Sequence, residues 1–173
     1  MPVESIRGRG ATRNSTPTRF NLKERAVEGD WLDSVDALDG VAKRRTTVTI
    51  EHPKTILTRN SSPDVGFDRS INAYRGCEHG CIYCFARPTH AFHDLSPGVD
   101  FESRLFVKPR AAQLLHSALS RPGYVCAPIA MGTNTDPYQP IEGKWRIMRS
   151  ILEVLGETRH PVCITTKSDR ITR

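Results

Sequence analysis

The chain has 173 residues, with 25 basic and 19 acidic side chains, a formal net charge of +6 and an apolar fraction of 38%. This length suits one domain, and no apolar run approaches the roughly 20 residues that a membrane-spanning helix needs. The amino-terminal stretch also lacks the apolar core of a secretory signal, so we expect neither a membrane protein nor an exported one.

Residues 1–45 are predicted to form a basic, irregular arm, and residues 46–173 to form the domain. The arm is rich in Arg, Thr, Ser and Gly and offers few large apolar side chains to bury. Its basic residues include Arg7, Arg9, Arg13, Arg19, Lys43, Arg44 and Arg45. They either neutralise the phosphates of a nucleic-acid partner or form a solvated basic surface, and the sequence leaves both interpretations open.

The domain is predicted to alternate strands with helices. Short β-branched or apolar runs indicate strands at residues 46–51, 55–59, 69–74, 101–107, 127–131 and 161–166. A stretch rich in Pro, Gly and polar residues predicts a loop at 88–98.

Two helices are expected between the later strands. The first, at 109–120, begins with Pro at a favourable position and repeats apolar residues at helical spacing. The second, at 141–157, is the most regular, with apolar side chains at Ile141, Trp145, Met148, Ile151, Leu152 and Leu155. This alternation predicts an α/β fold with a parallel sheet, whose functional groups gather at the carboxyl ends of the strands.

Three of the five cysteines form a compact motif. Cys77, Cys81 and Cys84 have the spacing C-x3-C-x2-C, which lets one tight loop direct three soft thiolates to one centre. Three thiolates can hold three irons of a four-iron cluster and leave the fourth iron open to a small ligand. The odd number of cysteines and their crowding argue against disulfides, so we expect a reducing, cytoplasmic compartment.

Two other classes of protein remain compatible with this motif. A zinc-stabilised nucleic-acid-binding module would complete a Cys3His site with His79, His90 or His93. An iron–sulfur electron carrier would use a fourth cysteine. Cys126 and Cys163 lack the local spacing for that role, and we predict that both are buried apolar residues.

The residues around the cysteines also resemble a known enzyme superfamily. The segment RGCEHGCIYCFARP at 75–88, with Tyr83 directly before the third cysteine, is similar to the signature loop of radical S-adenosylmethionine (radical SAM) enzymes. The likeness extends to GRGATRN at 8–14, RSINAYRGCEHGC at 69–81 and GTNTDPYQP at 132–140. Together these segments resemble an uncharacterised bacterial branch related to spore photoproduct lyase, described as DNA repair photolyase-like.

This resemblance implies a fold, two cofactors and a reaction. The fold is an incomplete partial (β/α) barrel with parallel strands. The three cysteines would hold a [4Fe-4S] cluster whose open iron binds S-adenosylmethionine (SAM). An electron from a flavodoxin or ferredoxin would then cleave SAM to a 5′-deoxyadenosyl radical that abstracts hydrogen. The branch suggests a lyase-like reaction on a modified nucleic acid, and the backbone at Tyr83 would approach the adenine of SAM.

Two further motifs follow directly on predicted strands and are expected to meet the cysteines at one face. In GTNTDPYQP, Thr135 and Asp136 could accept hydrogen bonds from the ammonium and ribose of SAM, in place of the Gly-Gly-Glu segment of many radical SAM enzymes. Asp136 could instead only fix the turn around Pro137. Lys167 would pair with the SAM carboxylate, with Ser168 as a weaker candidate, unless Lys167 is an ordinary solvated lysine.

The chain is also expected to be the amino-terminal part of a longer protein. Radical SAM barrels contain more parallel strands than the residues after the cysteine motif can supply. A sheet that stopped there would leave an open edge and uncovered apolar surface. We therefore expect this chain alone to take up iron and sulfide, to be aggregation-prone and to cleave little SAM.

Overall fold

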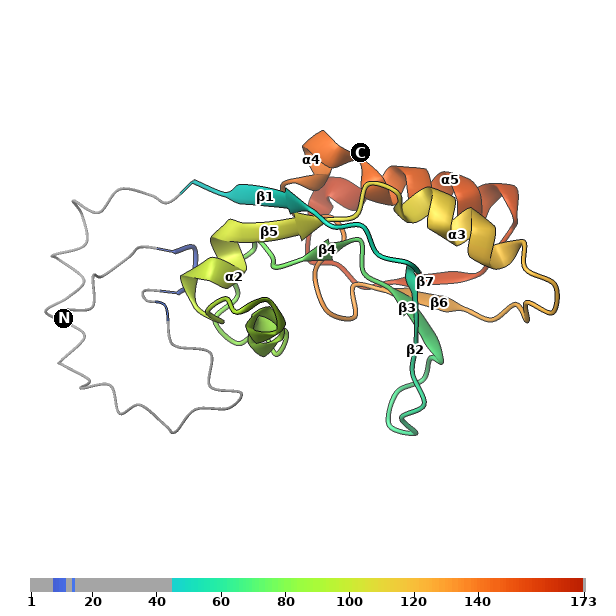
Figure 1. Ribbon diagram of the computed structural model, residues 1–173, viewed down its shortest axis with the longest axis horizontal. Coiled ribbons are helices and arrows are strands. Elements are labelled where there is room, and N and C mark those ends of the chain that lie inside the picture. Colours follow the sequence, from blue (N-terminus) through green and yellow to red (C-terminus); the bar gives the residue numbers. More distant parts are fainter. Residues whose placement is uncertain (1–7, 12–13, 15–44, 173) are drawn as a thin grey trace, which may run out of the picture.

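The computed structural model describes residues 8–11, 14 and 45–172, and their strands form two small sheets (Figure 1). The three-stranded sheet has the order β1-β5-β4, with strands β1 (Thr47–Ile50), β5 (Arg104–Val107) and β4 (Tyr74–Arg75). The four-stranded sheet has the order β2-β3-β6-β7, with strands β2 (Leu57–Arg59), β3 (Arg69–Ile71), β6 (Ile129–Met131) and β7 (Val162–Ile164).

Both sheets are mixed. β1 pairs with β5 in parallel, and β3, β6 and β7 pair in parallel in that order. β2–β3 and β4–β5 are antiparallel pairs. The α/β class is therefore confirmed, whereas the expectation of purely parallel strands is wrong, and the strands of the described residues do not close into a barrel.

The helices are short and follow the strands in the chain. They are the α-helices α2 (Val99–Ser103), α3 (Ala111–Leu119), α4 (Glu142–Trp145) and α5 (Ile147–Glu157), and the 3-10 helices η2 (Arg87–His93) and η3 (Asp169–Thr172). Among the described residues, no helix has both the length and the apolar character needed to cross a membrane.

The predicted strand at 69–74 is divided between the two sheets. Ile71 pairs with Met131 in β6, whereas Tyr74 pairs with Val107 in β5. Lys108 binds the two residues between these strands. Its Nζ donates to the Asn72 carbonyl at 2.7 Å, and its backbone N–H donates to the Ala73 carbonyl at 3.2 Å. These carbonyls are therefore satisfied without a continuous strand ladder.

The predicted helix at 141–157 is also broken. Arg146 has a φ of 50°, in the left-handed region, and separates α4 from α5. The carboxylate of Glu142 accepts the N–H groups of Met148 at 3.2 Å and Arg149 at 3.3 Å, so it satisfies free donors in the first turn of α5. The apolar periodicity was preserved across the break, which is why the sequence predicted a single helix.

Two other segments adopt helical turns that the sequence did not predict. The expected strand at 101–107 begins with α2, so only its second half forms β5. The expected loop at 88–98 opens with η2. All five residues of α2 are buried, and the alternation of apolar and charged residues at its start imitates the period of a strand.

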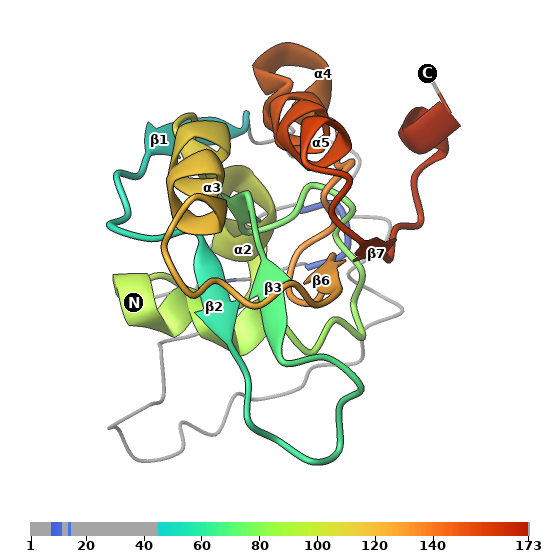
Figure 2. The same ribbon diagram turned by 90° about the vertical axis from the view of Figure 1, so that its right-hand side faces the viewer.

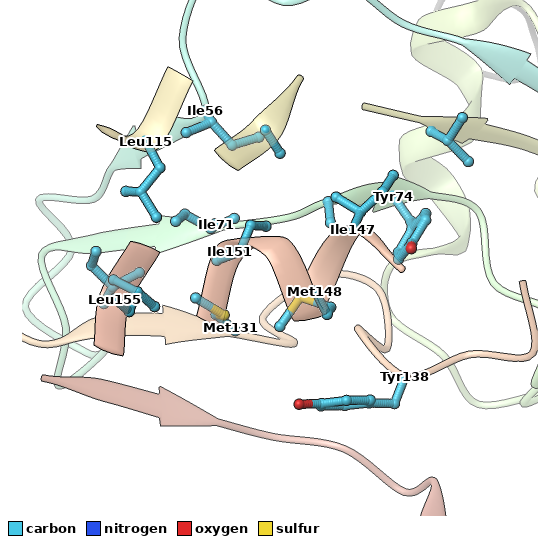
Figure 3. Packing of buried hydrophobic residues seen from close by; sticks show 14 residues of the cluster. Ile56, Ile71, Tyr74, Leu115, Met131, Tyr138, Ile147, Met148, Ile151 and Leu155 are labelled. Atoms are coloured by element: carbon cyan, nitrogen blue, oxygen red, sulfur yellow. The ribbon is translucent and has the colours of Figure 1, made fainter. Parts of the chain in front are cut away.

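The main core lies between the four-stranded sheet and two helices. Figures 1 and 2 both show α3 and α5 side by side on one face of this sheet. Leu115 of α3 and Ile151 and Leu155 of α5 are buried in one cluster with Ile71 and Met131 of the strands (Figure 3). The packing of these apolar faces stabilises the sheet whose strand ends carry the site.

Replacing Ile151 by Ala tests this core. Ile151 is fully buried, so Ile151→Ala should lower the free energy of unfolding by about 2–5 kcal/mol through lost burial and a new cavity. Urea unfolding followed by circular dichroism measures the change. Ile171→Ala is a matched control, because Ile171 is 43% exposed and should lose less than about 1 kcal/mol. Equal losses in the two variants would contradict this assignment of the core.

Candidate functional site

The cysteine loop, residues 77–84, connects β4 to η2. Its entry is fixed by the Cys77 N–H, which donates to the Phe101 carbonyl at 2.9 Å. Inside the loop, the Cys84 N–H donates to the Cys81 carbonyl at 3.2 Å. Cys77 is buried against Ala86 and Phe101, and this burial raises the pKa of its thiol to about 11. The loop therefore carries one buried thiol and two that reach its surface.

A zinc site and an iron–sulfur cluster need different arrangements of their ligands. Among the described residues, no three His, Cys, Asp or Glu side chains lie close enough together to hold a metal ion. A structural zinc site needs four ligands around one ion. In an iron–sulfur cluster, by contrast, each thiolate binds a different iron.

The histidines considered as zinc ligands have other contacts. His90 is buried, and its Nε2 lies 2.9 Å from the Arg104 carbonyl. The ring of His93 stacks on Phe106 with a centroid distance of 4.3 Å. His79 lies beside Asp136, with 3.5 Å between Nε2 and Oδ2. Each ring thus contacts a neighbour on another segment, and each also has one buried nitrogen without a hydrogen-bond partner among the described residues: His79 Nε2, His90 Nδ1 and His93 Nε2.

The 132–140 loop, which follows β6, is hydrogen-bonded to the cysteine loop. Gln139 is fully buried, its Oε1 accepts the Glu78 N–H at 2.9 Å, and its Nε2 donates to the Gly76 carbonyl at 3.1 Å. Thr135 is also buried, and its hydroxyl donates to the Tyr74 carbonyl at 3.0 Å. The Thr135 side chain thus holds β4 in place.

Asp136 connects the 132–140 loop to the end of β7. Its carboxylate accepts the Thr166 hydroxyl at 2.7 Å, the Lys167 N–H at 2.9 Å and the Tyr138 N–H at 2.9 Å. The bond from the Tyr138 N–H closes the turn around Pro137, which is the alternative role that the sequence allowed for Asp136. Asp136 therefore fixes its own turn and also orients the segment that carries Lys167.

Lys167 reaches from the end of β7 to the cysteine loop. Its Nζ donates to the Cys81 Sγ at 2.9 Å and to the Tyr83 hydroxyl at 2.9 Å. The hydrogen bonds to Cys81 and then Tyr83 raise the pKa of this amine. Tyr83 is 78% exposed, so its ring forms an open edge of the site. The three segments thus converge on one face, as the sequence predicted, although the cysteine loop follows β4 of the other sheet, in an antiparallel pair.

Ser168 takes a more local role than Lys167. Its N–H donates to the Thr166 hydroxyl at 3.1 Å, and its own hydroxyl accepts the Arg170 N–H at 3.3 Å. These bonds begin η3 and use the Ser168 hydroxyl within its own turn.

The structure adds a residue that the sequence alone did not single out. Arg87 follows the cysteine loop and is nearly buried. Its guanidinium donates to the carbonyls of Cys81 at 2.8 Å and Gly80 at 3.0 Å, and to those of Pro97 and Gly98 at 3.1 Å. Only its position in the motif RGCEHGCIYCFARP could have marked it.

The two cysteines outside the motif were predicted to be buried, and this prediction is wrong. Cys126 lies on the loop before β6 and Cys163 lies in β7, and both are exposed. In the described sheet β7 pairs only with β6, so the Cys163 side chain is not covered by a further element.

A buried lysine is connected to the 132–140 loop through Asn72. Lys108 follows β5, and its Nζ donates to the Asn72 carbonyl. The side chain of Asn72 in turn accepts the Asn134 N–H at 3.2 Å and donates to the Thr133 hydroxyl at 3.2 Å. Burial, followed by the nearby charge of Arg75, lowers the pKa of Lys108 to about 8.

The chain is similar to proteins from mycobacteria and an archaeon. It is 44% identical over 107 residues to "Uncharacterized protein Rv2578c" of Mycobacterium tuberculosis, which covers 62% of this chain and 32% of that protein. It is 30% identical over 103 residues to "Uncharacterized protein MJ0683" of Methanocaldococcus jannaschii, covering 60% of this chain and 36% of the relative.

These likenesses leave the activity open, because neither name states a function. The matched region spans about a third of the length of each of these relatives. No family model matches the chain. No solved structure matches it either.

The buried amine of Lys108 predicts a pH dependence of stability. Its folded pKa of about 8 lies below the ordinary value of 10.5, so the folded chain releases this proton first as the pH rises. Below about pH 8 the cost of the buried charge is fully present. Between about pH 8 and 10.5 the unfolded chain binds more protons, so the free energy of unfolding should rise by up to roughly 3 kcal/mol from this group.

Urea unfolding of the wild type and Lys108→Met across this pH range measures the effect. The raised pKa of Cys77 acts in the opposite direction in both proteins, so the difference between them isolates Lys108. The wild type should gain stability relative to the variant as the pH rises. A difference that stays constant with pH would contradict a buried, charge-suppressed lysine.

Proposed function

We propose that this chain carries the cofactor-binding part of a radical SAM enzyme, with Cys77, Cys81 and Cys84 as the ligands of a [4Fe-4S] cluster. The observation that carries the proposal is the contact of Lys167, which follows β7, with Cys81 of the cysteine loop, while Asp136 of the 132–140 loop holds the Lys167 backbone. Such a cluster, when bound, supplies the electron that cleaves SAM to methionine and a 5′-deoxyadenosyl radical.

The proposed fold is the beginning of a partial (β/α) barrel. β3, β6 and β7 are successive parallel neighbours, and helices α3 and α5 occupy the connections between them. The cysteine loop lies beyond β3, the 132–140 loop follows β6, and Lys167 follows β7. This order supports the proposal, because catalytic groups in such folds lie beyond the carboxyl ends of the strands.

Lys167 is proposed to bind the carboxylate of SAM. Its amine already lies against the cysteine loop, and Asp136 holds its backbone through the Lys167 N–H. A bound carboxylate would replace Cys81 and Tyr83 as the partner of this amine, in a charge-assisted hydrogen bond. Ser168 remains a secondary candidate for the same ligand.

Asp136 is the proposed partner for the ammonium or ribose of SAM. It lies at the same edge as Lys167 and is largely buried beside His79. Thr135 contributes less directly, because its hydroxyl is already bonded to the Tyr74 carbonyl. The backbone at Tyr83 is proposed to approach the adenine, as the resemblance implies, and Tyr83 lies on the exposed side of the loop.

The burial of Cys77 serves to exclude water from the inner side of the loop. Its thiol packs with Ala86 and Phe101, whereas the neighbouring Ile82, Tyr83 and Phe85 are exposed. An apolar inner wall limits solvent access to a redox group, and solvent access is one determinant of its potential.

The proposal includes partners and a compartment. A flavodoxin or ferredoxin would supply the electron, and a modified nucleic acid is the substrate class suggested by the resemblance. Arg9 is bound to Glu78, so phosphate contacts would fall to the other basic residues of the arm. A reducing, cytoplasmic location would keep the three thiols available for iron.

Anaerobic reconstitution with iron and sulfide tests the proposal. The wild type should turn brown, and its reduced-state electron paramagnetic resonance spectrum should change when SAM is added. Ala at Cys77, Cys81 or Cys84 should abolish stable cluster binding, because two thiolates cannot secure the cluster. Cys126→Ala and Cys163→Ala are matched controls and should retain the wild-type iron content.

Other outcomes separate the alternative classes. A colourless protein that holds one tight zinc would favour the Cys3His module. A brown protein whose spectrum ignores SAM would favour an electron carrier. Equal loss of iron in all five cysteine variants would overturn the assignment of the ligands.

A further inference from the structure

A segment far away in the sequence contacts the cysteine loop. The N-terminal segment, residues 8–11, lies beside α2 (Figure 1). Arg9 donates from its guanidinium to the Glu102 carbonyl at 2.6 Å, and the Gly10 N–H donates to the Glu102 Oε2 at 2.9 Å. Asn14 extends this contact, since its side chain exchanges two hydrogen bonds of 2.9 Å with Asp100.

Glu102 joins the N-terminal segment to the cysteine loop. Its side chain is almost fully buried, and Oε2 accepts the N–H groups of Arg9 and Gly10. The other oxygen, Oε1, forms an ion pair with Arg87. Arg87 then donates to two carbonyls of the loop, those of Gly80 and Cys81. One carboxylate, which lies about ninety residues from the N-terminal segment in the sequence, therefore couples that segment to the cysteine loop.

A second connection runs through Glu78, within the cysteine loop itself. Its carboxylate is buried, and Oε1 accepts hydrogen bonds from the Arg9 guanidinium at 2.9 Å and the Thr46 hydroxyl at 2.8 Å. A buried carboxylate without a cation is strongly unfavourable. Arg9 therefore keeps Glu78, and the loop around it, in this position.

The backbones of the two segments also touch. A Cβ at Gly10 would lie 1.8 Å from the Gly80 carbonyl oxygen, and a Cβ at Gly80 would lie 2.5 Å from the Arg9 Cβ. Gly80 has a φ of 65°, which also favours glycine. The contact is thus possible only because glycine occupies both positions.

We propose that Glu102 and the N-terminal segment are positioning elements of the cysteine loop. They fix its backbone in the metal-free chain from the side of Gly80, so that the loop is already ordered when a cluster binds and releases the cluster slowly. Pre-ordering lowers the entropic cost of binding. The statement about cluster release rests on the proposed function, whereas the ordering of the metal-free loop does not.

Gly10→Ala tests the ordering of the loop without changing a charge or the main core. Its methyl group must displace the N-terminal segment from Gly80. Hydrogen exchange of the metal-free protein should then be about tenfold faster at the amides of residues 77–84. Gly66→Ala is the matched control, because nothing lies within 4 Å of the added Cβ. Equal exchange in Gly10→Ala and the wild type would overturn the proposal.

Loss of the cluster provides a readout that general destabilisation does not mimic. After anaerobic reconstitution, a chelator should remove iron about fivefold faster from Gly10→Ala than from Gly66→Ala, at matched midpoints of thermal unfolding. If the wild type takes up no iron, the proposed function fails, and the exchange experiment still decides the role of the segment. Equal rates of iron loss would overturn the part of the proposal that concerns the cluster.

Arg9 provides an independent variant in case Gly10→Ala does not fold. Arg9→Gln removes the cation from Glu78 and should also speed exchange in the cysteine loop. Arg9→Lys retains the charge but cannot make all the contacts of the guanidinium, so it should restore part of the protection. If neither Arg9 variant changes exchange in residues 77–84, the N-terminal segment does not position the loop.

Discussion

The side-chain amide of Gln139 occupies the point where the two loops of the site meet. It is fully buried, and it pairs with the Gly76 carbonyl on one side and the Glu78 N–H on the other. A buried amide is costly unless its hydrogen bonds are made, so this pairing holds the two loops at a single spacing. The contact between Lys167 and the cysteine loop depends on that spacing, because Asp136 in the same loop as Gln139 orients the Lys167 backbone.

The parallel strands make this meeting of loops possible. β6 and β7 end beside each other, and Gly132 allows their ends to approach closely, since a Cβ there would lie 1.9 Å from the Thr165 carbonyl oxygen. The chain at Gly132 has a φ of 80°, which few other residues adopt. The turn directs the next residues toward β7, where Asp136 satisfies the hydroxyl of Thr166 and the N–H of Lys167.

The sequence predicted the parts of the structure that depend on local pattern. The apolar face of α5 follows from periodicity, and the positions of Asp136 and Lys167 follow from the rule that parallel strands end at one edge. The break at Arg146 could not be predicted, because it depends on capping by Glu142, which leaves the apolar period intact. Pairing of Arg87 with Glu102 was equally hidden, since neither residue has a distinctive local pattern.

Several buried charged side chains lie around the site, whereas the main core that stabilises the fold is apolar. The core between α3, α5 and the four-stranded sheet is apolar, whereas Arg87, Glu102 and Glu78 are buried around the cysteine loop. Buried ion pairs contribute little net stability compared with apolar packing, because both charges lose water. They do fix direction and distance, since breaking one partner leaves the other charge unpaired. Arg87 makes specific hydrogen bonds to the carbonyls of Gly80 and Cys81, which apolar side chains cannot make. These bonds help to hold the cysteines of the loop in one arrangement.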